Sequence, residues 1–120
     1  MPFYREIIKA IHEYDIPVVI HICGNAKNVV ELLNGVGANA ISFDSMVNMG
    51  YARSRLQCAL MGNVSTQLLH TGEGDKIISI SRNAIKSGVD IVSPACGLSM
   101  ATPVVNLRAM TDYVKKGNYN

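Results

Sequence analysis

The sequence lacks the long apolar runs and the strong charge excess that mark several classes of protein. None of its apolar runs approaches the roughly 20 residues that a membrane-spanning helix needs. Its formal net charge is only +2, and no cluster of Lys and Arg with interleaved aromatic residues is present. We therefore expect neither insertion into a membrane nor binding to nucleic acid.

A secretion signal and a paired set of cysteines are also missing. The first six residues, MPFYRE, contain neither the basic nor the apolar region of a signal peptide. The chain has three cysteines, an odd number that does not suit a framework of disulfides. We expect a cytoplasmic protein whose cysteines are buried, bound to a metal or catalytic.

What remains is the composition of an ordinary globular domain, with 48% hydrophobic and 17% charged residues in a chain of 120. This length suits a single domain over residues 1–120, with a substantial core. Four nearly continuous apolar runs predict buried strands at 18–23, 40–44, 58–64 and 89–93. Helices are predicted at 3–14, 26–33, 47–56 and 76–86, and a last helix begins at Pro103 with Thr102 as its N-cap. Residues 117–120 are expected to fray. The alternation predicts an α/β fold with a parallel sheet covered by helices.

Two cysteines and one histidine fall at the carboxyl ends of predicted strands. His21 and Cys23 are separated by one residue in a strand, so both side chains can point to the same side. Cys96 follows the last strand, between Pro94 and Gly97. Active sites of parallel α/β folds lie at this end of the strands. Two thiolates and an imidazole suit Zn²⁺, and three protein ligands leave a fourth position open, as in catalytic zinc sites.

These residue types also have simpler interpretations. A single cysteine in an apolar strand is usually a small buried hydrophobe, which is what we expect of Cys58. A histidine in a strand is more often a hydrogen-bonded core residue, so the pair of His21 and Cys23 alone leaves both interpretations open. His12 and His70 have no ligand-like neighbours in the sequence and are expected at the surface.

Three segments of the chain resemble a known family. These segments are residues 21–24 (HICG), 61–65 (MGNVS) and 93–98 (SPACGL), and they resemble segments in the carboxyl-terminal half of the family's proteins. The family is the uroporphyrinogen decarboxylase superfamily, and the resemblance is to its methylcobalamin:coenzyme M methyltransferase branch. It implies a parallel (β/α)₈ TIM-type barrel, of which this chain would supply the last four β-α units as a half-barrel. The amino-terminal half, which helps the family to bind substrate and corrinoid, would lie outside this chain.

The resemblance also implies roles for particular residues. His21, Cys23 and Cys96 would bind zinc, which deprotonates a small thiol such as coenzyme M. The thiolate would then attack a methyl group on the corrinoid of methylcobalamin or of a corrinoid protein. Asp44 would occupy the open zinc position until the thiol displaces it, and Asn63 and Ser65 would line the cofactor pocket.

Both the residues and the function have other interpretations. Asp44 can be a solvated strand-end residue or a helix N-cap, and Asn63 and Ser65 can simply cap the next segment. The chain can also be a non-catalytic fragment or a uroporphyrinogen decarboxylase-like protein, whose reaction needs no metal.

Half a barrel would leave two unpaired strand edges and an apolar inner face. The apolar strand residues, some of which must point inward, are Val18, Ile20, Ile41, Phe43, Leu60 and Ile91. We therefore expect a homo-dimer or a complementing amino-terminal half-barrel as the partner.

Overall fold

A four-stranded parallel sheet forms the centre of the computed structural model, which describes residues 1–117. The strands are β1 (Val19–Ile22), β2 (Ala40–Phe43), β3 (Ala59–Val64) and β4 (Ile91–Pro94). They lie in the order β1-β2-β3-β4, and all three pairings are parallel. The sheet is open, with β1 and β4 as its edges. This is the predicted α/β arrangement of four β-α units from a (β/α)₈ barrel.

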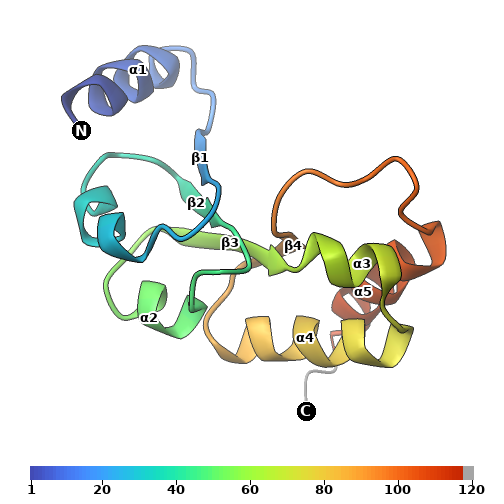
Figure 1. The fold of residues 1–120 in the computed structure, drawn as a ribbon. Helices are drawn as coiled ribbons and strands as arrows, with labels where there is room; N and C mark the ends of the chain where they lie inside the picture. Colours follow the sequence, from blue (N-terminus) through green and yellow to red (C-terminus); the bar gives the residue numbers. More distant parts are fainter. Residues whose placement is uncertain (118–120) are drawn as a thin grey trace.

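The helices lie unevenly along the sheet (Figure 1). They are α1 (Pro2–His12), α2 (Met49–Arg53), α3 (Thr66–Thr71), α4 (Gly74–Lys86) and α5 (Val104–Lys116). Helix α1 lies beside the β1 edge, whereas α3, α4 and α5 gather near β4. In residues 1–117, no helix is both long enough and apolar enough to span a membrane.

Two of the predicted helices are wrong in type or length. Residues 26–33 form two 3₁₀ turns, Lys27–Val29 and Glu31–Leu33, in place of one α-helix. The adjacent β-branched Val29 and Val30 disfavour a longer helix, and the segment ends at Asn34-Gly35.

The helix predicted at 47–56 is shortened to Met49–Arg53, because Asn48 caps its start by accepting the Tyr51 N–H and Gly50 weakens its interior.

Helices α3 and α5 also differ from the prediction, α3 in its existence and α5 in its N-cap. Helix α3 was not predicted, and Ser65 is its N-cap. Helix α5 begins at Val104 with Pro103 as its N-cap, because Pro103 keeps an extended ψ of 129°. Thr102 is therefore not the cap, and its buried hydroxyl has no hydrogen-bond partner among the described residues. Of the tail expected to fray, Gly117 ends α5 in a left-handed conformation, and residues 118–120 lie outside the described part.

The alternation of strand side chains separates the core from an open face. Ile20, Ile41, Phe43 and Leu60, which we considered for the inner face, are instead buried in clusters with residues of the helices and loops. Their neighbours face the other side, where Val19 is 48% and Ile91 45% exposed. Ile91, one of the residues named from the sequence, lies on this open face, which also has Met61 and Leu98 in its apolar wall. The same face carries His21 and Ser42 beside these apolar residues.

Gly62 in β3 is required where the backbones of β2 and β3 approach each other. Its φ is +134°, and an added Cβ would lie 2.8 Å from the carbonyl oxygen of Phe43. We expect Gly62→Ala to lower the free energy of unfolding by about 2 kcal/mol or more, through strain and overpacking. Urea denaturation measures this loss. Gly97→Ala is the control, because no atom of residues 1–117 lies within 4 Å of its added Cβ. Equal stability of the two variants would contradict the prediction.

Candidate metal centre

Three residues far apart in the sequence meet at the carboxyl end of the sheet. His21 lies in β1, Cys23 follows β1, and Cys96 follows β4. The Cys23 Sγ lies 3.3 Å from His21 Nε2 and 3.4 Å from Cys96 Sγ. The three possible ligand atoms all lie within 4.8 Å of one another. The structure thus brings together the residues that the sequence predicted as metal ligands, and metal binding itself stays a prediction.

The donor set and its spacing fit a thiophilic metal ion such as zinc. Zinc–sulfur bonds of about 2.3 Å place two sulfurs of a tetrahedral site roughly 3.8 Å apart. The observed 3.4 Å between the two sulfur atoms needs a shift of only a few tenths of an ångström. Three protein donors would leave one tetrahedral position for an exogenous ligand, which is the arrangement of catalytic sites.

The surroundings of Cys23 favour the protonated form of its thiol when no metal is bound. Its hydrogen bond with Cys96, followed by desolvation and the negative charge of Asp44, raises the pKa of Cys23. A bound cation reverses this preference, because it coordinates the thiolate and releases the proton. Metal binding should therefore weaken as the pH falls.

Asp44, directly after β2, anchors the turn that follows Cys23. Its Oδ2 accepts the Gly24 N–H at 2.9 Å, and its Oδ1 accepts the Ser45 hydroxyl at 3.1 Å. The hydrogen bond from Gly24 is the main reason that the pKa of Asp44 is lowered. Asp44 is therefore an ionised neighbour of Cys23, and its role as a displaceable ligand stays a prediction.

The imidazole of His21 is oriented by β2. Its Nδ1 lies 2.9 Å from the hydroxyl of Ser42, which is its register partner across the β1–β2 pair. The sequence did not single out Ser42, because only the register of the strands places it opposite the histidine.

A groove of about 600 Å³ runs along the open face of the sheet beside the cluster. Its volume is within the range of small-molecule sites. His21, Ser42 and Cys96 line it, together with an apolar wall. The other residues lining this groove are Val19, Met61, Ser93, Pro94, Gly97 and Leu98.

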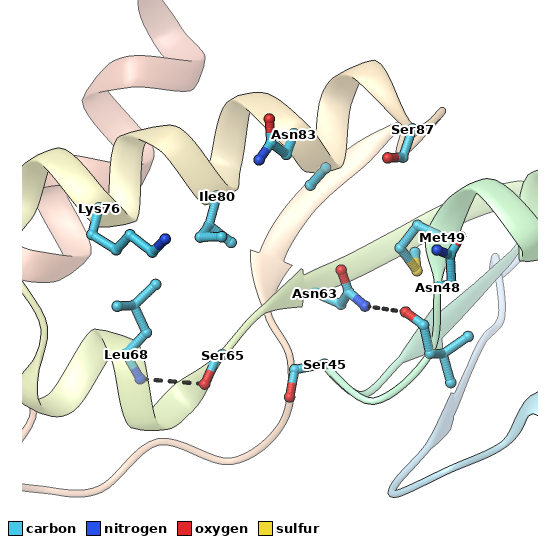
Figure 2. Close-up of a pocket in the computed structure, with 12 residues that line it drawn as sticks. Ser45, Asn48, Met49, Asn63, Ser65, Leu68, Lys76, Ile80, Asn83 and Ser87 are labelled. Carbon is cyan, nitrogen blue, oxygen red and sulfur yellow. Dashed lines mark hydrogen bonds between the residues drawn. The ribbon is translucent and has the colours of Figure 1, made fainter.

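Asn63 and Ser65 line a different cavity, of about 450 Å³, between β3 and the helices (Figure 2). The Asn63 amide donates to the carbonyl oxygens of Asp44 and Val47, at 3.0 and 2.8 Å. The Ser65 hydroxyl accepts the Leu68 N–H at 3.3 Å and so caps α3. Both residues make local structural contacts, and their predicted role in a cofactor pocket stays a prediction.

The remaining candidates lie away from the cluster. Cys58 is half-buried against the main core, and burial raises its pKa, as suits the packing role predicted for it. His12 bonds to the Asn39 side chain at 2.9 Å through its Nε2. His70 is not a plain surface residue as predicted, because its Nδ1 is buried without a hydrogen-bond partner among residues 1–117. Its position in α3, a helix absent from the prediction, explains the difference.

Comparison with known proteins gives a consistent family. The model of the uroporphyrinogen decarboxylase (URO-D) family matches residues 1–117. A methylcobamide:CoM methyltransferase, MtbA, of Methanosarcina acetivorans is 31% identical over 121 residues, which cover 99% of this chain. A methylated-thiol–coenzyme M methyltransferase of Methanosarcina mazei is 32% identical over 114 residues, covering 88% of this chain.

The matched region is only part of these relatives. It covers 36% of the first and 31% of the second, so the chain spans about a third of their length. A solved structure described as a methyltransferase from Methanosarcina mazei superposes with a TM-score of 0.86 at 24% identity. That match covers 95% of this chain and 34% of the other, and it supports the half-barrel fold.

Asn63 should contribute to stability through its two hydrogen bonds. In Asn63→Asp, a carboxylate would face the carbonyl oxygens of Asp44 and Val47, so we expect a loss of about 1–3 kcal/mol in the free energy of unfolding. Thermal or urea denaturation measures it. The control is Asn83→Asp, at an exposed residue of the same cavity, with an expected change within about 0.5 kcal/mol. A similar small change in both variants would contradict this assignment.

Proposed function

The chain belongs to the uroporphyrinogen decarboxylase (URO-D) family, and from this premise we propose that it is the zinc-binding part of a thiol methyltransferase. The observation that carries the proposal is the cluster of His21, Cys23 and Cys96 beside an open groove. The proposed reaction moves a methyl group from a corrinoid to a small thiol. The curated relatives named for methylcobamide and coenzyme M support these two substrates.

Each residue of the cluster has a proposed task. His21, Cys23 and Cys96 would hold the metal at the strand ends, and Asp44 would be a displaceable ligand that gives way to the thiol. Zinc, when bound, would supply a positive charge that keeps the incoming thiol deprotonated at neutral pH. The groove beside the cluster then orients the thiol, with Val19, Met61 and Leu98 as its apolar wall. A thiolate is the nucleophilic form of the thiol, so holding it ready is the chief contribution of this part of the fold.

Two alternatives compete with this proposal. A decarboxylase-like function would have no use for two cysteines and a histidine gathered at the strand ends, because that reaction needs no metal. A non-catalytic fragment would keep the metal site without turnover. The methyltransferase is favoured because the cluster adjoins a groove of small-molecule size.

The proposed catalyst also needs a partner for its open sheet. Within the described part of the chain, β1 and β4 each have one unpaired edge, and Val19 and Ile91 are exposed on the open face. Such edges favour pairing with further strands. We propose that a second copy of the chain or a complementing half-barrel completes the wall of the groove, and that a corrinoid or corrinoid protein approaches the carboxyl ends of the strands.

The purified chain should bind one zinc ion per molecule through these three ligands. We expect Cys96→Ser to lose most of its zinc, because it removes one of three donors. Elemental analysis and a chromogenic chelator measure stoichiometry and affinity. Cys58→Ala is the matched control and should keep its zinc, since Cys58 lies outside the cluster. Full zinc retention in Cys96→Ser, or zinc loss in Cys58→Ala, would contradict the assignment. Asp44→Ala should still bind zinc, with modestly lower affinity.

Methyl transfer provides the direct test of function. Zinc-loaded protein, methylcobalamin and coenzyme M should yield methylated thiol, and the cobalamin spectrum reports the loss of its methyl group. We expect turnover to be much faster when a complementing half-barrel is added, because it closes the groove. Zinc-loaded Cys58→Ala should behave like the unsubstituted chain. No turnover under either condition, with zinc fully bound, would favour the non-catalytic alternative.

A further inference from the structure

Ser42 is a buried polar residue whose side chain meets the candidate metal centre. It is 5% exposed and lies on β2, which has a paired strand on both sides. Its hydroxyl lies 2.9 Å from Nδ1 of His21, while Nε2 of the same ring lies 3.3 Å from the sulfur of Cys23. One imidazole therefore links a buried hydroxyl to the cysteine pair.

A neutral imidazole carries one proton, which can sit on either ring nitrogen. If Ser42 accepts a hydrogen bond from Nδ1–H, the lone pair of Nε2 points at the cysteines and is ready for a metal. If Ser42 donates its proton to Nδ1, then Nε2 carries the hydrogen and cannot ligate without losing it. A serine hydroxyl can donate or accept, so the tautomer of His21 decides whether Nε2 is free to bind a metal.

We propose that Ser42 is a positioning residue, which holds His21 in the tautomer whose free Nε2 faces the sulfurs of Cys23 and Cys96. The inference rests on the proposed metal site and names a residue beyond its ligands. The hydrogen bonds then run in one direction. In this tautomer Cys96 would donate to Cys23, Cys23 would donate to Nε2 of His21, and Nδ1–H would donate to Ser42. Each of these three donors has an acceptor, and the Ser42 oxygen is the last of them.

The surroundings of Ser42 make it a rigid support. Its neighbours in β2, Ile41 and Phe43, are fully buried, so the strand cannot turn without disrupting the core. Two residues further, Asp44 accepts the Gly24 N–H. Ser42 and Asp44 thus hold residues 21–24 at two points, the ring of His21 and the backbone N–H of Gly24. Outer-shell hydrogen bonds of this kind fix the orientation of metal-bound histidines, and removing one typically weakens metal affinity about 10–100-fold.

The first test uses the metal-free, full-length chain labelled with ¹⁵N, at a pH where the imidazole is neutral. The nitrogen chemical shifts of His21 identify the protonated ring nitrogen, and His12 serves as an internal reference. We expect the proton on Nδ1 in the unsubstituted chain and a mixture of tautomers in Ser42→Ala. A proton on Nε2 in the unsubstituted chain would overturn the proposal without any variant.

The second test measures zinc affinity by competition with a chromogenic chelator. Ser42→Ala should bind zinc about 10–100-fold more weakly, whereas Ser42→Thr, which keeps the hydroxyl, should restore most of the affinity. Ser93→Ala is the matched control, because Ser93 is a buried serine of the same groove whose hydroxyl donates to the Pro94 carbonyl. Unchanged zinc affinity in Ser42→Ala, or equal weakening in Ser93→Ala, would overturn the proposal.

The two tests separate this inference from the proposed function. If the unsubstituted chain binds no zinc but carries the proton of His21 on Nδ1, and Ser42→Ala loses this preference, the positioning role holds and the zinc proposal fails. If zinc binds with high affinity and Ser42→Ala changes neither the tautomer nor the affinity, the metal site holds and the role of Ser42 is wrong.

Discussion

Parallel pairing of the four strands is the constraint on which the candidate site depends. In a parallel sheet, the carboxyl ends of all strands lie on the same side, so residues that follow the first and the last strand can meet there. This is how Cys23 and Cys96, which are 73 positions apart, come to lie 3.4 Å from each other. The same pairing sets His21 opposite Ser42 and brings Asp44 to the backbone of Gly24. A shift of register between β1 and β2 would separate both contacts.

The two faces of the sheet have different surroundings, since one packs in the core and the other lines a groove. On one side, buried residues such as Phe43 and Leu60 pack in the main core cluster. On the other, His21 and Ser42 lie among exposed apolar residues of an uncovered groove. Polar side chains and exposed apolar side chains therefore share one face, and the core does not have to accommodate either. The relatives are about three times as long as the region that matches this chain.

Much of this arrangement could be predicted from the sequence, because apolar runs and their spacing reflect burial directly. The strands and the α/β class followed from those patterns, whereas the half-barrel and the grouping of His21, Cys23 and Cys96 also rested on the resemblance to a known family. The 3₁₀ turns at 27–33 did not, since a short segment with adjacent β-branched residues has nearly balanced local preferences. Nor did the hydrogen bond of Ser42 or the side-chain direction of Asn63, because each depends on strands that are neighbours only in space.

The placement of the ligands on both edge strands has a mechanical consequence. His21 and Cys23 extend from β1, and Cys96 extends from β4, so one ion held by all three would join the two free ends of the sheet. Such an ion would hold the two edge strands at a fixed separation and so set the curvature of the half-barrel. Any partner that docks against both edges must match the same curvature. Metal and partner would then stabilise one shape together, and by thermodynamic reciprocity each would raise the affinity for the other.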